Sequence, residues 1–215
     1  PMTTPSTTPA QRSTADKLQR VLTIVLWLGM ICAMLAVVGV KMIFPHRDIP
    51  VLYPAGAYAL TDQDGKPFSD AALRGKPYVC DFVFTTCGSV CPIMSSKMAT
   101  LQNRMPASVS FVSFSVDPTH DTPPVLKDYA HRYGADESRW HFLTGTAEQM
   151  AAVAKKMNIT AVPATKDDPI MHSDRFLLID GDGNVRGVYD SKDEQSMQKL
   201  VDDAAFLSRS RGARG

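Results

Sequence analysis

The chain has almost no net charge, with 23 basic and 22 acidic residues among 215 and a formal charge of +1. Proteins that bind nucleic acid through its phosphates normally carry a basic surface, so this balance argues against nucleic acid as a partner. The sequence also lacks internal repeats and both glycine-rich phosphate-binding patterns, the P-loop and the dinucleotide fingerprint. Composition and motifs therefore give no sign of a repeat architecture or a nucleotide site.

Charged residues are absent from one long stretch, the twenty residues from Val21 to Val40. About 20 apolar residues are enough to cross a hydrocarbon core of about 30 Å. A cleaved signal peptide would have a shorter apolar region, of about 7 to 15 residues, followed by small residues at the cleavage site. We therefore predict an uncleaved transmembrane signal anchor over residues 17–44.

Basic residues on either side of this run predict its orientation. Three precede it and two follow it closely: Arg12, Lys17 and Arg20, then Lys41 and Arg47. The positive-inside rule places the N-terminus in the cytoplasm. We predict a single-pass protein of the bacterial inner membrane with its C-terminal domain in the periplasm. Residues 1–16 are rich in Ser, Thr and Pro and predict a disordered cytoplasmic tail.

Beyond the anchor, we predict a linker over residues 45–54, one domain over residues 55–208 and a basic tail over residues 209–215. Strand and helix patterns alternate along the domain. The patterns predict strands at residues 58–61, 78–85, 109–116, 140–143, 175–179 and 185–189, and helices at residues 91–104, 121–133, 146–157 and 194–208. This alternation favours an α/β sandwich of three layers.

Two cysteines, Cys87 and Cys91, follow directly after the apolar strand pattern of residues 78–84. A helix that begins at Val90 or Cys91 would place Cys87 just before its N-terminus, where free N–H groups and the helix dipole favour a thiolate. Such a pair can form a disulfide, act as a redox pair or bind a soft metal ion, and the spacing alone does not choose between these.

A strand followed by a dithiol at a helix start is typical of thioredoxin-like redox and metal sites. Asp81 lies within the same apolar strand pattern, where an unpaired carboxylate is costly to bury. It resembles the buried aspartate of thioredoxins, which implies a proton acceptor for the dithiol. The alternative is a strand residue held by ordinary hydrogen bonds.

Three blocks of the sequence resemble the signature motifs of the Sco/SenC family and occur in the family order. They are residues 84–92 (FTTCGSVCP), residues 115–123 (SVDPTHDTP) and Met171-His172-Ser173 ahead of residues 176–180 (FLLID). The resemblance covers about residues 55–207. It implies a membrane-tethered copper protein with a thioredoxin-like fold that assembles the binuclear copper centre of cytochrome c oxidase subunit II.

In that family two cysteines and one distant histidine bind copper, which implies Cys87, Cys91 and His172 as the ligands here. The donor types agree with this, because two thiolates favour Cu(I) and an added imidazole makes a site that also holds Cu(II). A structural zinc site would normally have a fourth protein ligand. Neither remaining cysteine offers one, because Cys80 lies on the strand and Cys32 in the apolar run.

Two functions of different class remain open. The first is a copper chaperone for subunit II, with other periplasmic copper chaperones and thiol reductants as further partners. The second is a thiol-disulfide oxidoreductase in which Cys87 and Cys91 form a redox pair. His172 distinguishes them, because a dithiol reductase does not need an imidazole at that position.

The other candidate ligands have simpler interpretations. We expect four histidines not to bind copper: His46, His120, His131 and His141. Three methionines near the motif are more typical of a core than of a metal site: Met94, Met98 and Met171. Asp117 resembles a family aspartate associated with metal delivery, but a residue of a turn before a helix would look the same.

Overall fold

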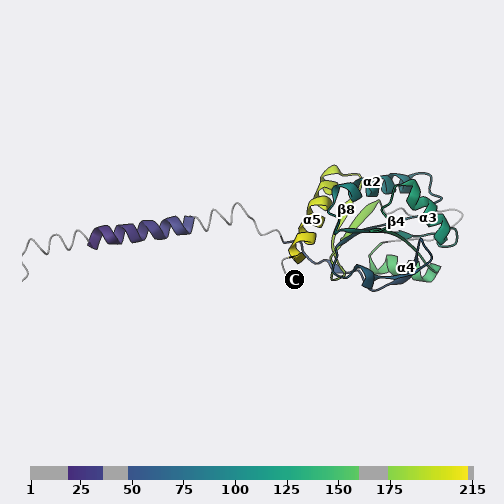
Figure 1. The fold of residues 1–215 in the computed structure, drawn as a ribbon, viewed down its shortest axis with the longest axis horizontal. Helices are drawn as coiled ribbons and strands as arrows, with labels where there is room; N and C mark the ends of the chain where they lie inside the picture. The colour runs from purple at the N-terminus through teal and green to yellow at the C-terminus, as the bar shows by residue number, and fades with distance from the viewer. Residues whose placement is uncertain (1–18, 36–47, 160–173, 213–215) are drawn as a thin grey trace, which may run out of the picture. The chain divides into compact units, whose positions relative to one another are not determined.

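The computed structural model describes residues 19–35, 48–159 and 174–212, and the chain divides into two units between Asp48 and Ile49. In the first unit, residues 19–35 form a helix whose large apolar side chains are exposed (Figure 1). Within the described ranges, no helix has both the length and the apolar character needed to cross a membrane. The uncharged run continues to Val40, outside these ranges, so the anchor and its orientation stay predictions.

The second unit is built on one sheet of eight strands. In chain order the strands are β1 (Tyr53–Pro54), β2 (Ala59–Asp62), β3 (Pro67–Ser69), β4 (Tyr78–Val83), β5 (Ser110–Ser115), β6 (Trp140–Thr144), β7 (Arg175–Ile179) and β8 (Asn184–Asp190). Across the sheet the order is β1-β8-β7-β4-β5-β6-β2-β3. Strands β4, β5 and β6 pair in parallel, and the other pairs are antiparallel.

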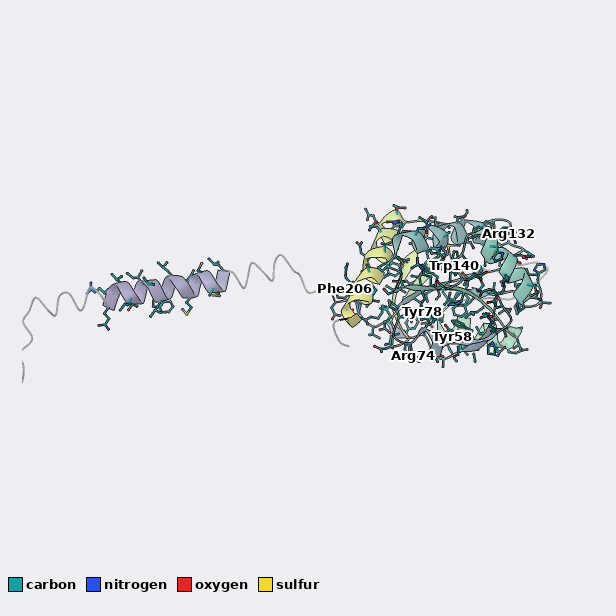
Figure 2. All side chains as sticks on the ribbon, viewed as in Figure 1. Tyr58, Arg74, Tyr78, Arg132, Trp140 and Phe206 are labelled. Atoms are coloured by element: carbon teal, nitrogen blue, oxygen red, sulfur yellow. The ribbon has the colours of Figure 1, made fainter. Side chains whose placement is uncertain are left out.

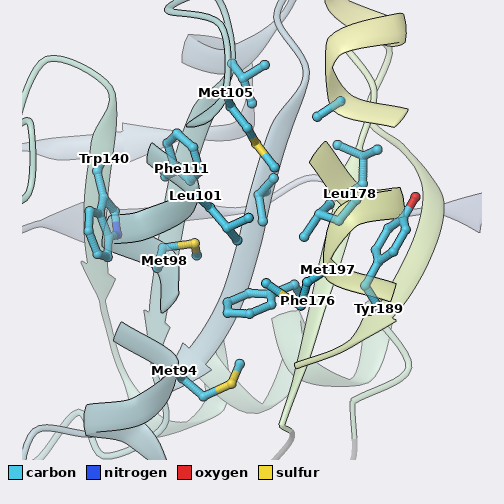
Figure 3. Close-up of a cluster of buried hydrophobic side chains, with 14 of the residues drawn as sticks. Met94, Met98, Leu101, Met105, Phe111, Trp140, Phe176, Leu178, Tyr189 and Met197 are labelled. Atoms are coloured by element: carbon cyan, nitrogen blue, oxygen red, sulfur yellow. The ribbon is translucent and has the colours of Figure 1, made fainter. Parts of the chain in front are cut away.

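Helices cover both faces of this sheet. Helices α2 (Val90–Arg104), α3 (Pro123–Arg132) and α5 (Glu194–Gly212) share one core cluster with the sheet, and α4 (Ala147–Lys156) and the short 3-10 helix η1 (Asp70–Leu73) share the other. Figure 3 shows the first cluster, where Met94 and Met98 of α2 are buried with Trp140 and Phe176 of the sheet. The predicted three-layer sandwich is therefore confirmed.

The central strands are buried on both faces, as parallel strands between two helical layers require. Their side chains alternate between the two clusters: Val79 packs with α2, whereas Tyr78, Cys80 and Phe82 pack on the side of α4. Asp81 follows the same alternation and faces the side of α2. It accepts a hydrogen bond there from Ser113 of β5. Ser113 in turn accepts a hydrogen bond from the indole N–H of Trp140, a residue labelled in Figure 2.

Two boundaries differ from the sequence prediction. Strand β1 lies inside the stretch predicted as a linker, and Ile49, 4% exposed, packs in the core. The Arg186 side chain donates hydrogen bonds to the carbonyl oxygens of Ile49 and Pro50, so the packed domain begins before residue 55. Helix α5 runs to Gly212 and includes the first residues of the predicted basic tail.

Candidate metal and redox site

The site begins where β4 ends and α2 begins. Ligand sites in α/β sheets lie outside the carboxyl ends of the parallel strands, and Cys87 and Cys91 lie at that end of β4. Cys91 is the second residue of α2, and Cys87 lies in the loop just before it. The predicted placement of both cysteines is confirmed. Both are free thiols in the structure, and they pack with Val83 and Phe84 in a small apolar cluster.

The Cys87 thiol caps α2. Ser89 precedes the helix, but its side chain makes no capping hydrogen bond. The N–H of Cys91 instead donates to Cys87 Sγ at 3.4 Å, and Ser89 Oγ lies 3.7 Å from the same sulfur. A free donor at a helix N-terminus normally has a side-chain oxygen as its acceptor, so here the sulfur takes that place. The contact holds the thiol against the positive end of α2.

The two thiols have opposite electrostatic environments. Partial burial raises the pKa of Cys87, but the N–H groups of Cys91 and Ser89 and the side chains of both residues stabilise its thiolate. Together they lower the pKa below the ordinary value. Burial raises the pKa of Cys91 far above its usual range, and the Cys87 and Asp81 charges act in the same direction. Cys87 is therefore the more acidic of the two thiols, and Cys91 keeps its proton to a higher pH.

Asp81 is fully buried on β4. Ser113 Oγ donates to its Oδ1 at 2.7 Å, and no partner is found for its Oδ2 in the part of the chain described. Burial raises the pKa of Asp81 to about 7, although the Ser113 hydrogen bond acts in the opposite direction. The hydrogen bond from Ser113 agrees with the alternative interpretation, a strand residue held by hydrogen bonds. The role of Asp81 as a proton acceptor stays a prediction.

A second loop, between β5 and α3, lies beside the cysteine loop. The two strands are neighbours, and the N–H of Val116 donates to the carbonyl oxygen of Val83 at 2.9 Å. Asp117 accepts the N–H of His120 at 3.4 Å, as a turn residue would. Asp121 is fully buried and accepts hydrogen bonds from Thr85 of the cysteine loop.

The sequence did not predict this link between the two loops, because it places Asp121 only at the start of the predicted helix over residues 121–133. The N-cap of α3 is Thr122. Thr85 and Asp121 are 36 positions apart, and no local pattern connects them. Only the pairing of β4 with β5 brings them together. Predicting this contact would therefore have required predicting the register of the two strands.

The remaining candidate residues fall into two groups. His172, Met171 and His46 lie outside the described residues. His131 pairs with Glu137 on the surface of α3, His141 packs against Phe68, and His120 lies near Asp121. Across residues 19–35, 48–159 and 174–212, no group of three His, Cys, Asp or Glu side chains could hold a metal ion.

Two adjacent thiols, one of them with a lowered pKa, are a soft donor pair, and soft donors select Cu(I) among the common metals. Cys80 is not available to them, because it packs on the other side of the sheet, where its sulfur lies 3.9 Å from Met157 Sδ. The residues present therefore fit a copper ion, provided that a further donor completes the site.

Comparisons with known proteins agree with this chemistry. Residues 52–205 match the family model SCO1/SenC. The SCO1 protein homolog of Bacillus subtilis is 31% identical over 164 residues, which cover 74% of this chain and 85% of that protein. Among solved structures, BsSco, a member of the Sco family of cytochrome c oxidase assembly proteins, is 31% identical with a TM-score of 0.67, covering 76% of this chain and 97% of that chain.

The structure of Bradyrhizobium japonicum ScoI with copper bound is 27% identical with a TM-score of 0.61, covering 73% of this chain and 99% of that chain. These structures also support the predicted thioredoxin-like α/β fold. The family match spans both cysteines, the buried loop contacts around Asp121 and the segment that contains His172. The chain belongs to the SCO1/SenC family.

Proposed function

We propose that this protein binds copper and takes part in the assembly of cytochrome c oxidase. The observation that carries the proposal is the free dithiol at the start of α2, inside the region that matches the family. One solved relative holds copper, and another belongs to a family of oxidase assembly proteins. In finer detail, we propose that the protein is a membrane-anchored, periplasmic copper chaperone for the binuclear copper centre of subunit II.

The proposed ligands are Cys87, Cys91 and His172. Copper would be the cargo, held as Cu(I) or Cu(II), and the protein would supply the donor atoms. Cys87 is held at the helix N-terminus as the more acidic thiol. Cys91 must lose its proton for copper to bind, and the raised pKa of this thiol makes binding weaker at low pH. An open site with three protein ligands leaves room for a ligand of the receiving subunit.

Copper titration of the reduced protein tests the proposal. We expect about one copper per chain, with thiolate charge-transfer absorption in the Cu(II) form. His172→Ala should weaken Cu(II) binding about 10-fold or more and Cu(I) binding much less, because two thiolates alone still hold the softer ion. His131→Ala, a surface histidine bonded to Glu137, is the matched control. Equal Cu(II) affinity in wild type and His172→Ala would remove His172 from the site.

The second candidate function is thiol-disulfide exchange with the cysteines of subunit II. The opposite pKa shifts of Cys87 and Cys91 favour it, because a low-pKa attacking thiol beside a protonated resolving thiol is the arrangement of dithiol reductants. Cys87 would attack the disulfide of the receiving protein and release one of its thiols. Cys91 would then attack the mixed disulfide, release the second thiol and leave Cys87 and Cys91 oxidised.

A further inference from the structure

One buried carboxylate joins the cysteine loop to the neighbouring loop. Asp121 has no exposed side-chain surface, accepts hydrogen bonds from three groups of Thr85 and Ser115, and lies within hydrogen-bond distance of His120. The Thr85 hydroxyl donates to Oδ1 at 2.5 Å, and the Thr85 N–H lies 3.3 and 3.2 Å from the two carboxylate oxygens. Ser115 Oγ donates to Oδ2 at 2.6 Å, and His120 Nδ1 lies 3.2 Å from Oδ1.

These groups come from three places in the fold. Ser115 ends β5, Thr85 follows the end of β4, and His120 is in the turn that leads into α3. Asp121 is thus the point at which the carboxyl ends of two central parallel strands are tied together. A buried carboxylate is costly unless it is well bonded, and the three donors of Thr85 and Ser115 meet this condition.

The tie is close to the first cysteine, because Thr85 is two residues before Cys87. The loop beyond it is exposed at Thr86 and Gly88, and a Cβ added at Gly88 would meet no atom of the described residues within 4 Å apart from its chain neighbours. The N–H of Cys87 donates to the carbonyl oxygen of Phe84 at 3.2 Å, which forms a turn around Thr85. Fixing Thr85 therefore fixes this turn and the direction in which Cys87 leaves it.

We propose that Asp121 is a positioning residue for the dithiol. It holds the turn at Thr85 so that the Cys87 sulfur stays at the N-terminus of α2, beside Cys91. The metal-related part of this inference rests on the proposed copper function: a preorganised pair of thiols binds copper more tightly than a pair on a free loop. Residues that orient ligands from outside a site typically change metal affinity about 10-fold to 100-fold when replaced.

Asp121→Asn is the main test, made in the full-length protein. The amide keeps the size of the carboxylate but replaces one accepting oxygen with an NH₂ group. The backbone N–H of Thr85 can only donate, so it cannot form a hydrogen bond with that group. We expect hydrogen exchange in a peptide spanning residues 84–90 to become faster by about 10-fold, and Cu(II) affinity to fall by about 10-fold with an altered charge-transfer band.

Asp203→Asn is the matched control. Asp203 is also fully buried and bonded, accepting from Tyr189 Oη at 2.7 Å and from Lys199, but it lies on α5. It should lower stability without changing exchange at residues 84–90 or the copper spectrum. Thr85→Val and Thr85→Ser form a second pair of variants, which tests the same contact even if Asp121→Asn does not fold. Valine removes the hydroxyl and should weaken Cu(II) binding, whereas serine keeps it and should restore wild-type affinity.

Three results would overturn the inference: unchanged exchange at residues 84–90 in Asp121→Asn, unchanged copper affinity despite faster exchange, or equal effects of Asp121→Asn and Asp203→Asn. A wild-type protein that held no copper would contradict the proposed function instead. The exchange comparison would then still support or overturn the positioning of the cysteine loop, because it is made on the metal-free protein.

Discussion

At the scale of single residues, the site depends on which polar groups are buried and how they are bonded. Asp121 is buried with three donors from Thr85 and Ser115, whereas Asp81 is buried with one donor and one oxygen without a partner among the described residues. A carboxyl with too few donors keeps its proton to a higher pH, and burial raises the pKa of Asp81 to about 7. Asp81 is therefore a titratable group under the helix that carries Cys91.

This pKa shift predicts a pH dependence of stability. The carboxyl of Asp81 ionises near its ordinary pKa of 3.8 in the unfolded chain but only near 7 in the folded one. Between these values the folded state binds the extra proton, so the free energy of unfolding falls as pH rises and levels off above about 7.

Asp81→Asn should remove this dependence. Its amide oxygen can still accept from Ser113, and we expect it to be more stable than wild type by on the order of 1–3 kcal/mol at pH 8, with a smaller difference at pH 5. Urea unfolding at both pH values measures this. The same difference at pH 5 and pH 8 would rule out titration of Asp81 in this range.

At the scale of elements, a variant in helix α4 tests whether the layer on the other side of the sheet affects copper binding. Thr146 and Gln149 form a capping box, in which Thr146 Oγ1 accepts the N–H of Gln149 and the Gln149 side chain accepts the N–H of Thr146. Thr146→Ala should lower the free energy of unfolding by about 1 kcal/mol. Because α4 covers the face opposite α2, copper binding should not change. A loss of copper affinity matching that of Asp121→Asn would show that the layers are coupled.

The elements that the sequence predicts well are those with strong local signals. Strands β5 and β7 and helices α2 and α4 begin and end within about two residues of the predicted bounds, because strong periodicity and cap residues are local signals. Strand β1 has only two residues and depends on pairing with β8, so no local pattern marks it. The place of Cys87 and Cys91 followed from a local strand and helix start, whereas the tie between Thr85 and Asp121 depends on long-range pairing.

At the scale of the whole molecule, we predict that an N-terminal membrane anchor holds the domain in the periplasm. The prediction rests on the uncharged run from Val21 to Val40 and the basic residues before it. Alkaline phosphatase fused after residue 215 should be active in a bacterial host, because that reporter folds only in an oxidising exterior. A reporter active only in the cytoplasm at the same fusion point would reverse the orientation.

The central claim is that copper binding, and not thiol exchange alone, is the task of the site. It is tested most directly by oxidase assembly at limiting copper in a bacterium that carries only a variant of this protein. If copper delivery is the task, Cys87→Ser, Cys91→Ser and His172→Ala should fail alike, because all three remove a proposed ligand. If the dithiol only transfers electrons, His172→Ala should assemble the oxidase nearly as well as wild type, because exchange needs only the two thiols. We predict that His172→Ala fails; normal assembly by this variant at low copper would contradict the account.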